Sequence, residues 1–292
     1  MFATWPIVGK VALKVVPSVA LVAFRVAGAA LAFILIGALR GRIGSIQKRD
    51  WPLLIASSLL GVVLNQWLFV KGLSLTSVIN ATLLGTLIPV FTLLVSIALR
   101  TDRVSLRRII GICLAAAGVL YLIGPERAEF SSATRLGDLL IVTNSLCYGA
   151  YIVISKDLMK RYSALTVITW IFIVGSVATV PFGAMSVSHA PLADVRPAIW
   201  LAIVYIVLVP TVGAYYLNAW ALGRVAPSTV AVYIYLQPLI AFSLAPLLLG
   251  EKLSWRTLVA ASLIFAGVLV VTRRGRSRAI REVSEHPEAF GH

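Results

Sequence analysis

The chain has 292 residues, of which 60% are hydrophobic and only 13% are charged, and its mean hydropathy is +0.95. This composition lies far outside that of soluble globular proteins, is typical of a polytopic membrane protein and excludes a large soluble domain. The formal net charge of +15 would suit nucleic-acid binding, but the distribution of the charges favours a membrane topology instead.

Ten apolar runs follow one another along the chain, and most have the length of about 20 residues that a helix needs to cross the hydrocarbon layer. They are continuous and do not alternate in polarity, so they predict helices and not barrel strands. The predicted spans are 2–15, 17–39, 51–72, 75–99, 105–123, 138–156, 163–185, 197–221, 226–249 and 253–272. The expected fold is an all-α integral membrane protein with ten transmembrane helices.

The lysines and arginines divide unevenly between alternate connections. One side of the predicted membrane collects 17 of the 26, the other side has eight, and Arg25 lies within a span. By the positive-inside rule the richer side is cytoplasmic, which predicts a multi-pass protein of the inner (plasma) membrane with both termini in the cytoplasm. Topology thus accounts for the basic charge, and we expect no nucleic-acid partner.

An internal repeat relates the two halves of the chain at an offset of 149 residues. Pro89 precedes Asp102 by 13 positions, as Pro238 precedes Glu251. Both prolines lie near the middle of predicted spans, where the lost backbone hydrogen bond either bends the helix or exposes backbone groups to a polar cavity. We predict a helix break at each proline, and the sequence leaves both outcomes open.

The repeat predicts two five-helix halves, residues 1–124 and 125–273, followed by a polar cytoplasmic tail, 274–292. Because five is an odd number, the second half is inverted relative to the first. Inverted repeats recur in secondary transporters, whose substrate site lies near the midplane where the halves meet. Aligning residues 5–10 with 151–156 also predicts that the first helix is truncated at its start.

The more specific half reads APSTVAVYIYLQPLIAFSLAPLLLGEKLSWRTLVAASLIFAGVLVV, residues 226–271. This order of an aromatic-rich span, a mid-span proline, an acidic residue and a glycine-bearing last span resembles the EamA family of the drug/metabolite transporter superfamily. The resemblance covers nearly the whole chain. It implies ten transmembrane helices in two inverted halves and carriage of small metabolites, often outward, but it does not name the substrate. We expect amino acids, amines or related compounds. Asp102 departs from the glutamate usual at that position of the family.

Uncharged polar and aromatic side chains concentrate in the spans that flank the two prolines. Such groups are costly in hydrocarbon unless they are paired, so they face the bundle interior or a wet cavity. The alternative for each is a structural hydrogen bond between helices. We predict a substrate cavity lined by Gln66, Trp67, Tyr148, Tyr216, Trp220, Tyr233 and Gln237, with Arg25, Asn80, Asn144, Asn218 and Tyr235 as further candidates.

Arg25 is the one charge well inside a predicted span. A guanidinium there can bind a carboxylate or phosphate of the substrate. The alternative, which the sequence favours, is an arginine that is paired to backbone carbonyls or that reaches the membrane interface. An antiporter of phosphate-bearing metabolites would need two or more buried cations, so it stays second to a general metabolite carrier.

Residue constellations for catalysis or metal binding are missing from the sequence. The three histidines lie in a connection and in the tail, the acidic residues lie at span ends, in connections or in the tail, and no nucleophile or metal-binding motif is present. We therefore expect no enzyme activity, no catalytic residue, no metal and no cofactor, with an integral-membrane enzyme as the minor alternative. The expected partners are a small-molecule substrate and the lipid bilayer.

The fifth and tenth spans carry small residues at related positions, GICLAAAG at 111–118 and AASLIFAG at 260–267. Small residues let two helices approach closely in a membrane. These spans are candidates for an outer scaffold or for a homodimer contact, and the sequence does not choose between the two.

Overall fold

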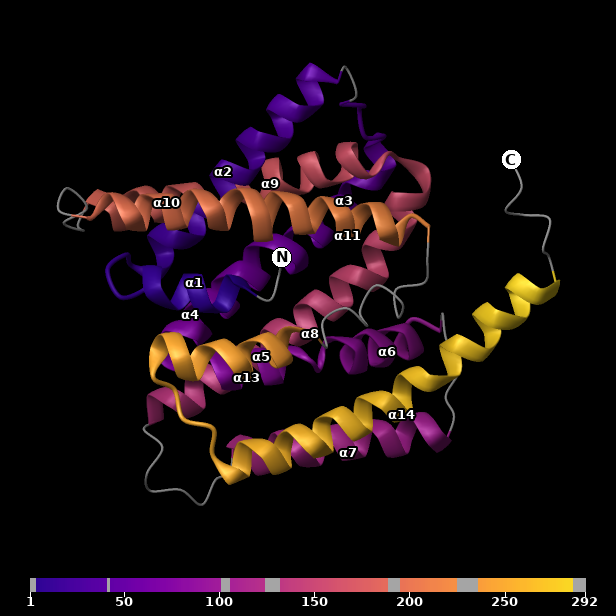
Figure 1. The fold of residues 1–292 in the computed structure, drawn as a ribbon. Coiled ribbons are helices and arrows are strands. Elements are labelled where there is room, and N and C mark those ends of the chain that lie inside the picture. Colours follow the sequence, from indigo (N-terminus) through magenta and orange to yellow (C-terminus); the bar gives the residue numbers. More distant parts are fainter. Residues whose placement is uncertain are drawn as a thin grey trace.

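Helices make up almost all of the part of the chain that the computed structural model describes, which is residues 4–40, 43–100, 106–123, 132–188, 195–224 and 236–285. Within these ranges no strand is present, and the helices form one bundle (Figure 1). The all-helical class predicted from the continuous apolar runs is therefore confirmed.

The first half of the chain folds into helices whose bounds follow its proline and serine residues. Pro6, Pro52 and Pro89 each occupy one of the first two positions of a helix, where a missing N–H costs nothing. The Ser77 hydroxyl accepts from the Asn80 backbone N–H and caps the helix Val78–Gly85 at its start. The elements are α1 (Trp5–Ala12), α2 (Ser18–Leu39), η2 (Lys48–Asp50), α3 (Trp51–Ser58), η3 (Leu59–Leu64), α4 (Asn65–Leu75), α5 (Val78–Gly85), α6 (Ile88–Ala98) and α7 (Leu106–Ile123).

The second part of the described chain contains the three longest helices, α8, α9 and α14. Its elements are α8 (Ser132–Arg161), α9 (Ala164–Ser188), α10 (Pro197–Ile206), η5 (Val207–Gly213), α11 (Ala214–Leu222), α13 (Leu236–Leu249) and α14 (Trp255–Glu285). The last helix continues beyond the predicted span 253–272, so the first residues of the predicted tail extend it.

Six helical stretches of the described residues are long and apolar enough to cross a membrane: Ser18–Leu39, Lys48–Leu75, Val78–Ala98, Ala133–Arg161, Ala164–Val187 and Pro197–Leu222. Three shorter apolar helices, Ile109–Leu122, Ile240–Leu249 and Trp255–Val270, add to these. The protein is therefore a multi-pass membrane protein, and the full count of ten spans stays a prediction.

Two apolar cores divide the bundle. The larger core joins α2, α8, α9 and the α10–α11 stretch, and the smaller one joins α5, α7, α13 and α14. Helices α2 and α9 pack together, as do α4 and α8. Helices α7 and α14 lie side by side along one edge of the bundle, away from α2 and α9 (Figure 1).

Positions related by the offset of 149 contact each other reciprocally where α7 meets α14. A Cβ on Gly118 would lie 2.8 Å from the Ile264 side chain, and one on Gly267 would lie 2.5 Å from the backbone nitrogen of Ala115. Ile264 and Ala115 are themselves equivalent positions. The small residues of these two helices thus face each other, and glycine is required because the backbones approach so closely.

Candidate functional site

A hydrogen bond joins Gln66 of α4 to Tyr215 of α11, and these two residues occupy equivalent positions in the two halves. The Gln66 Nε2 donates to the Tyr215 hydroxyl across 3.2 Å. The same hydroxyl lies 3.0 Å from the Gly61 carbonyl and 3.0 Å from the Asn65 Oδ1, to either of which it can donate. All of these groups are buried or half-buried, so the contact is an internal polar junction between the halves.

Segments of π-helix lie at equivalent places in the two halves and supply backbone groups to this junction. The first is η3, which contains Gly61, and the second is η5, which contains Thr211. A π-helical turn leaves carbonyls free of the usual ladder and is frequent at functional sites. Gly61 also lets the Tyr151 ring approach, since a Cβ there would lie 2.4 Å from the ring.

A second group of polar side chains continues the junction onto α8. Asn144 donates to the Asn65 carbonyl at 2.7 Å, and the Asn218 amide donates to the Tyr148 hydroxyl at 2.6 Å. The Tyr148 ring meets the Tyr215 ring edge to face, with centroids 6.2 Å apart. The Asn218 Oδ1 is buried and has no hydrogen-bond partner among the described residues.

Arg25 of α2 enters the same region from the side of α1 and η5. It is only 2% exposed. Its Nε and Nη2 donate to the Thr211 hydroxyl at 3.2 and 3.1 Å, and its guanidinium lies 3.7 Å from the centroid of the Trp5 ring. The Thr211 hydroxyl donates in turn to the Ile206 carbonyl at 2.7 Å.

The other predicted cavity residues lie in different surroundings. Trp67 meets Phe182 edge to face, and its Nε1 is buried without a partner among the described residues. Tyr216 is half-buried against the larger core, whereas Trp220 is 45% exposed and lies under the Arg224 guanidinium. The name central junction is used below for Arg25, Asn65, Gln66, Tyr148, Thr211, Tyr215 and Asn218.

The predicted residues of the ninth span are only partly within the described chain. Tyr233 and Tyr235 lie outside it, and Gln237 is half-buried at the start of α13. Pro238 follows Gln237 in the first turn of α13. Pro89 lies in the first turn of α6, just after the turn at Thr86 and Leu87 that separates α5 from α6, so the predicted span 75–99 is interrupted there.

One end of the bundle is held by charged groups that bind helix termini. Lys10 donates to the carbonyls of Leu73 and Thr76 at the end of α4, at 2.7 and 2.5 Å. The Glu251 carboxylate accepts from the amides of Val78 and Ile79 at the start of α5, at 2.7 and 3.0 Å. Each charge has the sign that the helix dipole favours at that terminus.

Asp138 also lies at this end, in the second turn of α8, and it is buried. Its carboxylate accepts from the Thr76 hydroxyl at 2.5 Å and from the Asn80 side-chain amide at 3.2 Å. The sequence placed Asp138 at a span end but gave no sign of this burial. Asn80, a further candidate for the cavity, is thus engaged by a carboxylate of the protein itself.

A cavity of about 500 Å³ opens at the same end, between α1, α5, the end of α13 and the segment before α14. Its charged lining consists of Lys10, Lys14, Lys252 and Glu251. The three lysines outnumber the single glutamate, so the cavity presents a surplus of positive charge.

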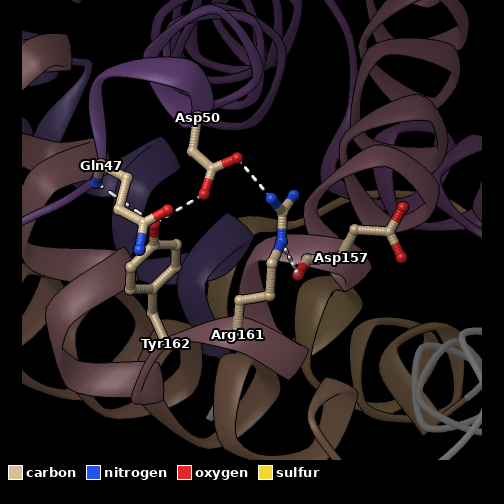
Figure 2. Close-up of polar contacts among 5 residues, drawn as sticks. All are labelled: Gln47, Asp50, Asp157, Arg161 and Tyr162. Carbon is tan, nitrogen blue, oxygen red and sulfur yellow. Dashed lines mark hydrogen bonds and ion pairs between the residues drawn. The ribbon is translucent and has the colours of Figure 1, made fainter.

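At the opposite end of the bundle, an ion pair joins two side chains (Figure 2). Asp50, just before α3, pairs with Arg161 at the end of α8 and accepts from the Tyr162 hydroxyl at 2.6 Å. The Gln47 backbone N–H donates to the same hydroxyl at 3.2 Å. These bonds tie the connection after α2 to the turn between α8 and α9.

Tyr215, Thr211 and Asn65 belong to the junction, yet the sequence analysis did not select them. One signal was available for Tyr215, because adding the repeat offset of 149 to Gln66 gives this residue. Thr211 and Asn65 offered no signal beyond their polarity within an apolar span.

Comparison with known proteins identifies the family of this chain. The model of the EamA-like transporter family matches residues 1–124 and 135–273. The chain belongs to this family. An uncharacterized transporter of Archaeoglobus fulgidus is 28% identical over 226 residues, which cover 77% of each chain. A probable terminal-alkyne amino-acid exporter of Streptantibioticus cattleyicolor is 27% identical over 236 residues, 80% of this EamA protein and 77% of that one.

A solved crystal structure also resembles this EamA protein. It superposes with a TM-score of 0.66 at 21% sequence identity and covers 94% of this chain and 96% of the other. At this identity the likeness shows the fold alone. The relatives are transporters, so the family membership identifies the bundle as that of a transporter of the drug/metabolite type.

Proposed function

We propose that this EamA-family protein is a secondary transporter that moves small metabolites, such as amino acids or amines, outward across the inner membrane by alternating access. Ten transmembrane helices form two inverted halves, residues 1–124 and 125–273, with both termini in the cytoplasm. The substrate binds at the central junction, where the halves meet.

The contact between Gln66 and Tyr215 carries this proposal. Equivalent positions of two repeats touch each other only near the axis that relates the repeats, as in any two-fold contact. For an inverted repeat that axis lies in the membrane plane, so the contact is expected at the midplane, where such transporters bind their substrates. The reciprocal contacts of Gly118 and Gly267 support the same axis.

The two ends of the bundle support alternating access. The Asp50–Arg161 pair links the first half to the second and closes one end, whereas the other end keeps a cavity. A rearrangement of the halves about the central junction would break the first closure and collapse the cavity. By the positive-inside rule, we expect the ion-pair end to lie in the cytoplasm.

The amino-acid exporter among the relatives supports a substrate of that class, whereas an antiporter of phosphate-bearing metabolites finds less support. Among the side chains that the structure describes, Arg25 is the only fully buried lysine or arginine. A phosphate with two negative charges would need a second cation in the same place.

The experiment is a comparison of metabolites in the medium of cells that express the wild type or Asn218→Ala. Asn218 is half-buried and offers an unpaired Oδ1, so its truncation removes a ligand for the substrate while little packing is lost. We expect the wild type to enrich particular metabolites in the medium, and Asn218→Ala to lower that enrichment severalfold at equal amounts of folded protein. The exposed Ser262→Ala is the control. The absence of any wild-type enrichment would contradict the exporter.

A further inference from the structure

The Arg25 guanidinium is a buried charge without a counter-charge in the described part of the protein. It is 2% exposed, and its neighbours are a hydroxyl, an aromatic ring and the Tyr215 phenol. A cation in this setting has lost its hydration, and neutral groups restore only part of that loss. Charges of this kind inside a membrane are rare and mark sites of function.

Every carboxylate whose side chain the structure describes is engaged elsewhere, at one of the two ends of the bundle. Asp50 pairs with Arg161, and Asp157 pairs with Lys160. Asp138 binds Thr76 and Asn80, and Glu251 binds the amides at the start of α5. The described protein therefore offers Arg25 no anion of its own.

The contacts of Arg25 hold its guanidinium in place without using all of its donors. A guanidinium has five N–H donors in a planar fork. The Thr211 hydroxyl accepts from the Nε and Nη2, and the Trp5 ring covers one face of the plane. The Nη1 has no hydrogen bond among the described residues, so donors remain for a ligand. A planar fork fits a carboxylate by two parallel hydrogen bonds.

The charged cavity lies further along the helix whose Trp5 covers this group. Helix α1 carries Trp5, which stacks on Arg25, and Lys10, which lines the cavity one and a half turns further along. Lys14 and Lys252 add positive charge to the same lining. A cleft lined by one sign of charge attracts ions of the opposite sign, so cavity and buried guanidinium favour the same class of substrate.

We propose that Arg25 binds a carboxylate of the transported metabolite, so that the substrates of this protein are small carboxylates, amino acids included, and not simple amines. This inference rests on the proposed function and sharpens its substrate class. Thr211 and Trp5 are positioning residues, since they orient the guanidinium and leave part of its fork for the ligand.

The test compares the medium of cells that express the wild type, Arg25→Met, Arg25→Lys or Arg256→Met. Arg256 is a matched control, because its guanidinium also lies over an aromatic ring, Tyr121, and donates to a backbone carbonyl, but at an exposed position outside the junction. We expect the metabolites enriched by the wild type to carry a carboxylate. Arg25→Met should lower their enrichment about tenfold or more, since charge-assisted hydrogen bonds are lost. Arg25→Lys should keep part of it, and Arg256→Met all of it.

The melting temperature of the purified variants separates a binding role from a structural one. Arg25→Met removes a buried charge that lacks a counter-charge and leaves the Thr211 hydroxyl bonded to Ile206, so we expect a melting temperature equal to or above that of the wild type. A structural arginine predicts a clear decrease instead.

Each failure has its own signature. Wild-type enrichment of metabolites without a carboxylate, unchanged enrichment by Arg25→Met, or a melting temperature lowered by several degrees overturns the role of Arg25 and leaves the exporter standing. No enrichment by the wild type overturns the exporter, and the inference with it.

Discussion

Equivalent positions of the two halves meet in two regions of this molecule, and the two meetings differ in chemistry. In the central junction Gln66 meets Tyr215 through a hydrogen bond among buried polar groups. Between α7 and α14, Gly118 meets the Ile264 side chain and backbone atoms, and Gly267 meets backbone atoms only. The first contact is between groups that can exchange partners, and the second is between surfaces that fit in one arrangement only.

The difference separates a region suited to movement from one suited to support. Hydrogen-bonding groups that lose one partner can take another, including a substrate, whereas close packing of small residues is lost by any shift of an ångström or so. We infer that α7 and α14 form the scaffold on which the remaining helices rearrange. Since their small-residue faces cover each other, a homodimer would have to use other surfaces of these helices.

The largest effect is expected at the scaffold, for Gly267→Leu. A Cβ at this position would lie 2.5 Å from the Ala115 nitrogen and 2.5 Å from the Gly111 carbonyl oxygen. These are backbone atoms that cannot move aside, so the helices must separate. We expect a loss of most folded protein, measured as the monodisperse fraction after size-exclusion chromatography in detergent.

Ser262→Leu is the control for this change, because Ser262 lies on the exposed side of α14. It adds a larger side chain to the same helix and should leave the folded fraction unchanged. Equal yields for both variants would contradict the close α7–α14 contact.

A smaller effect on stability, with a large one on transport, is expected for Tyr215→Phe in the junction. The change removes the hydroxyl that binds Gln66 and leaves that amide with one partner fewer, at a cost of roughly 1–3 kcal/mol in the free energy of unfolding. Because the junction joins the halves at the substrate site, transport of the enriched metabolites should fall severalfold while most of the protein still folds.

Tyr121→Phe serves as the matched control, since Tyr121 lies at an exposed position of α7. Thermal unfolding and export are measured for both variants. A Tyr215→Phe protein that transports like the wild type would show that the contact between the halves is only structural.

The contrast between Tyr215 and Tyr216 shows how far the sequence alone predicts such a site. Hydropathy, span order and the repeat indicated an all-helical membrane transporter, because these follow from the length and polarity of whole segments. The spacing of four between Tyr216 and Trp220 favoured that pair for the cavity, yet Tyr215 is the buried residue and Trp220 is exposed. In a membrane the lipid-facing side of a helix is apolar too, so hydropathy does not distinguish it from the inner side.

A second reason lies in the π-helical segments η3 and η5. A π-helical turn adds about one residue to the α-helical turn and rotates everything that follows. The positions of Asn65, Gln66 and Tyr215 all depend on such a turn just before them, and regular α-helical spacing cannot predict it. The partner of Arg25, Thr211, lies inside one of these segments for the same reason.

The smallest effect is expected at the closed end of the bundle, for Asp50→Asn. The change weakens the bonds to Arg161 and Tyr162, and because Arg161 is 38% exposed the pair contributes only about 1 kcal/mol. That energy belongs to the closed arrangement and not to the fold, so the open arrangement should become about fivefold more populated. Cys147 is a buried thiol of α8, and we expect it to become more accessible on opening. In a Cys113→Ser background, its reaction with N-ethylmaleimide should accelerate about fivefold. Asp157→Asn is the control, since this exposed carboxylate lies near the same ion pair (Figure 2) and itself pairs with Lys160. Equal labelling rates for Asp50→Asn and Asp157→Asn would show that the ion pair does not hold this end closed. The ion pair would then not control the movement that we expect at the junction.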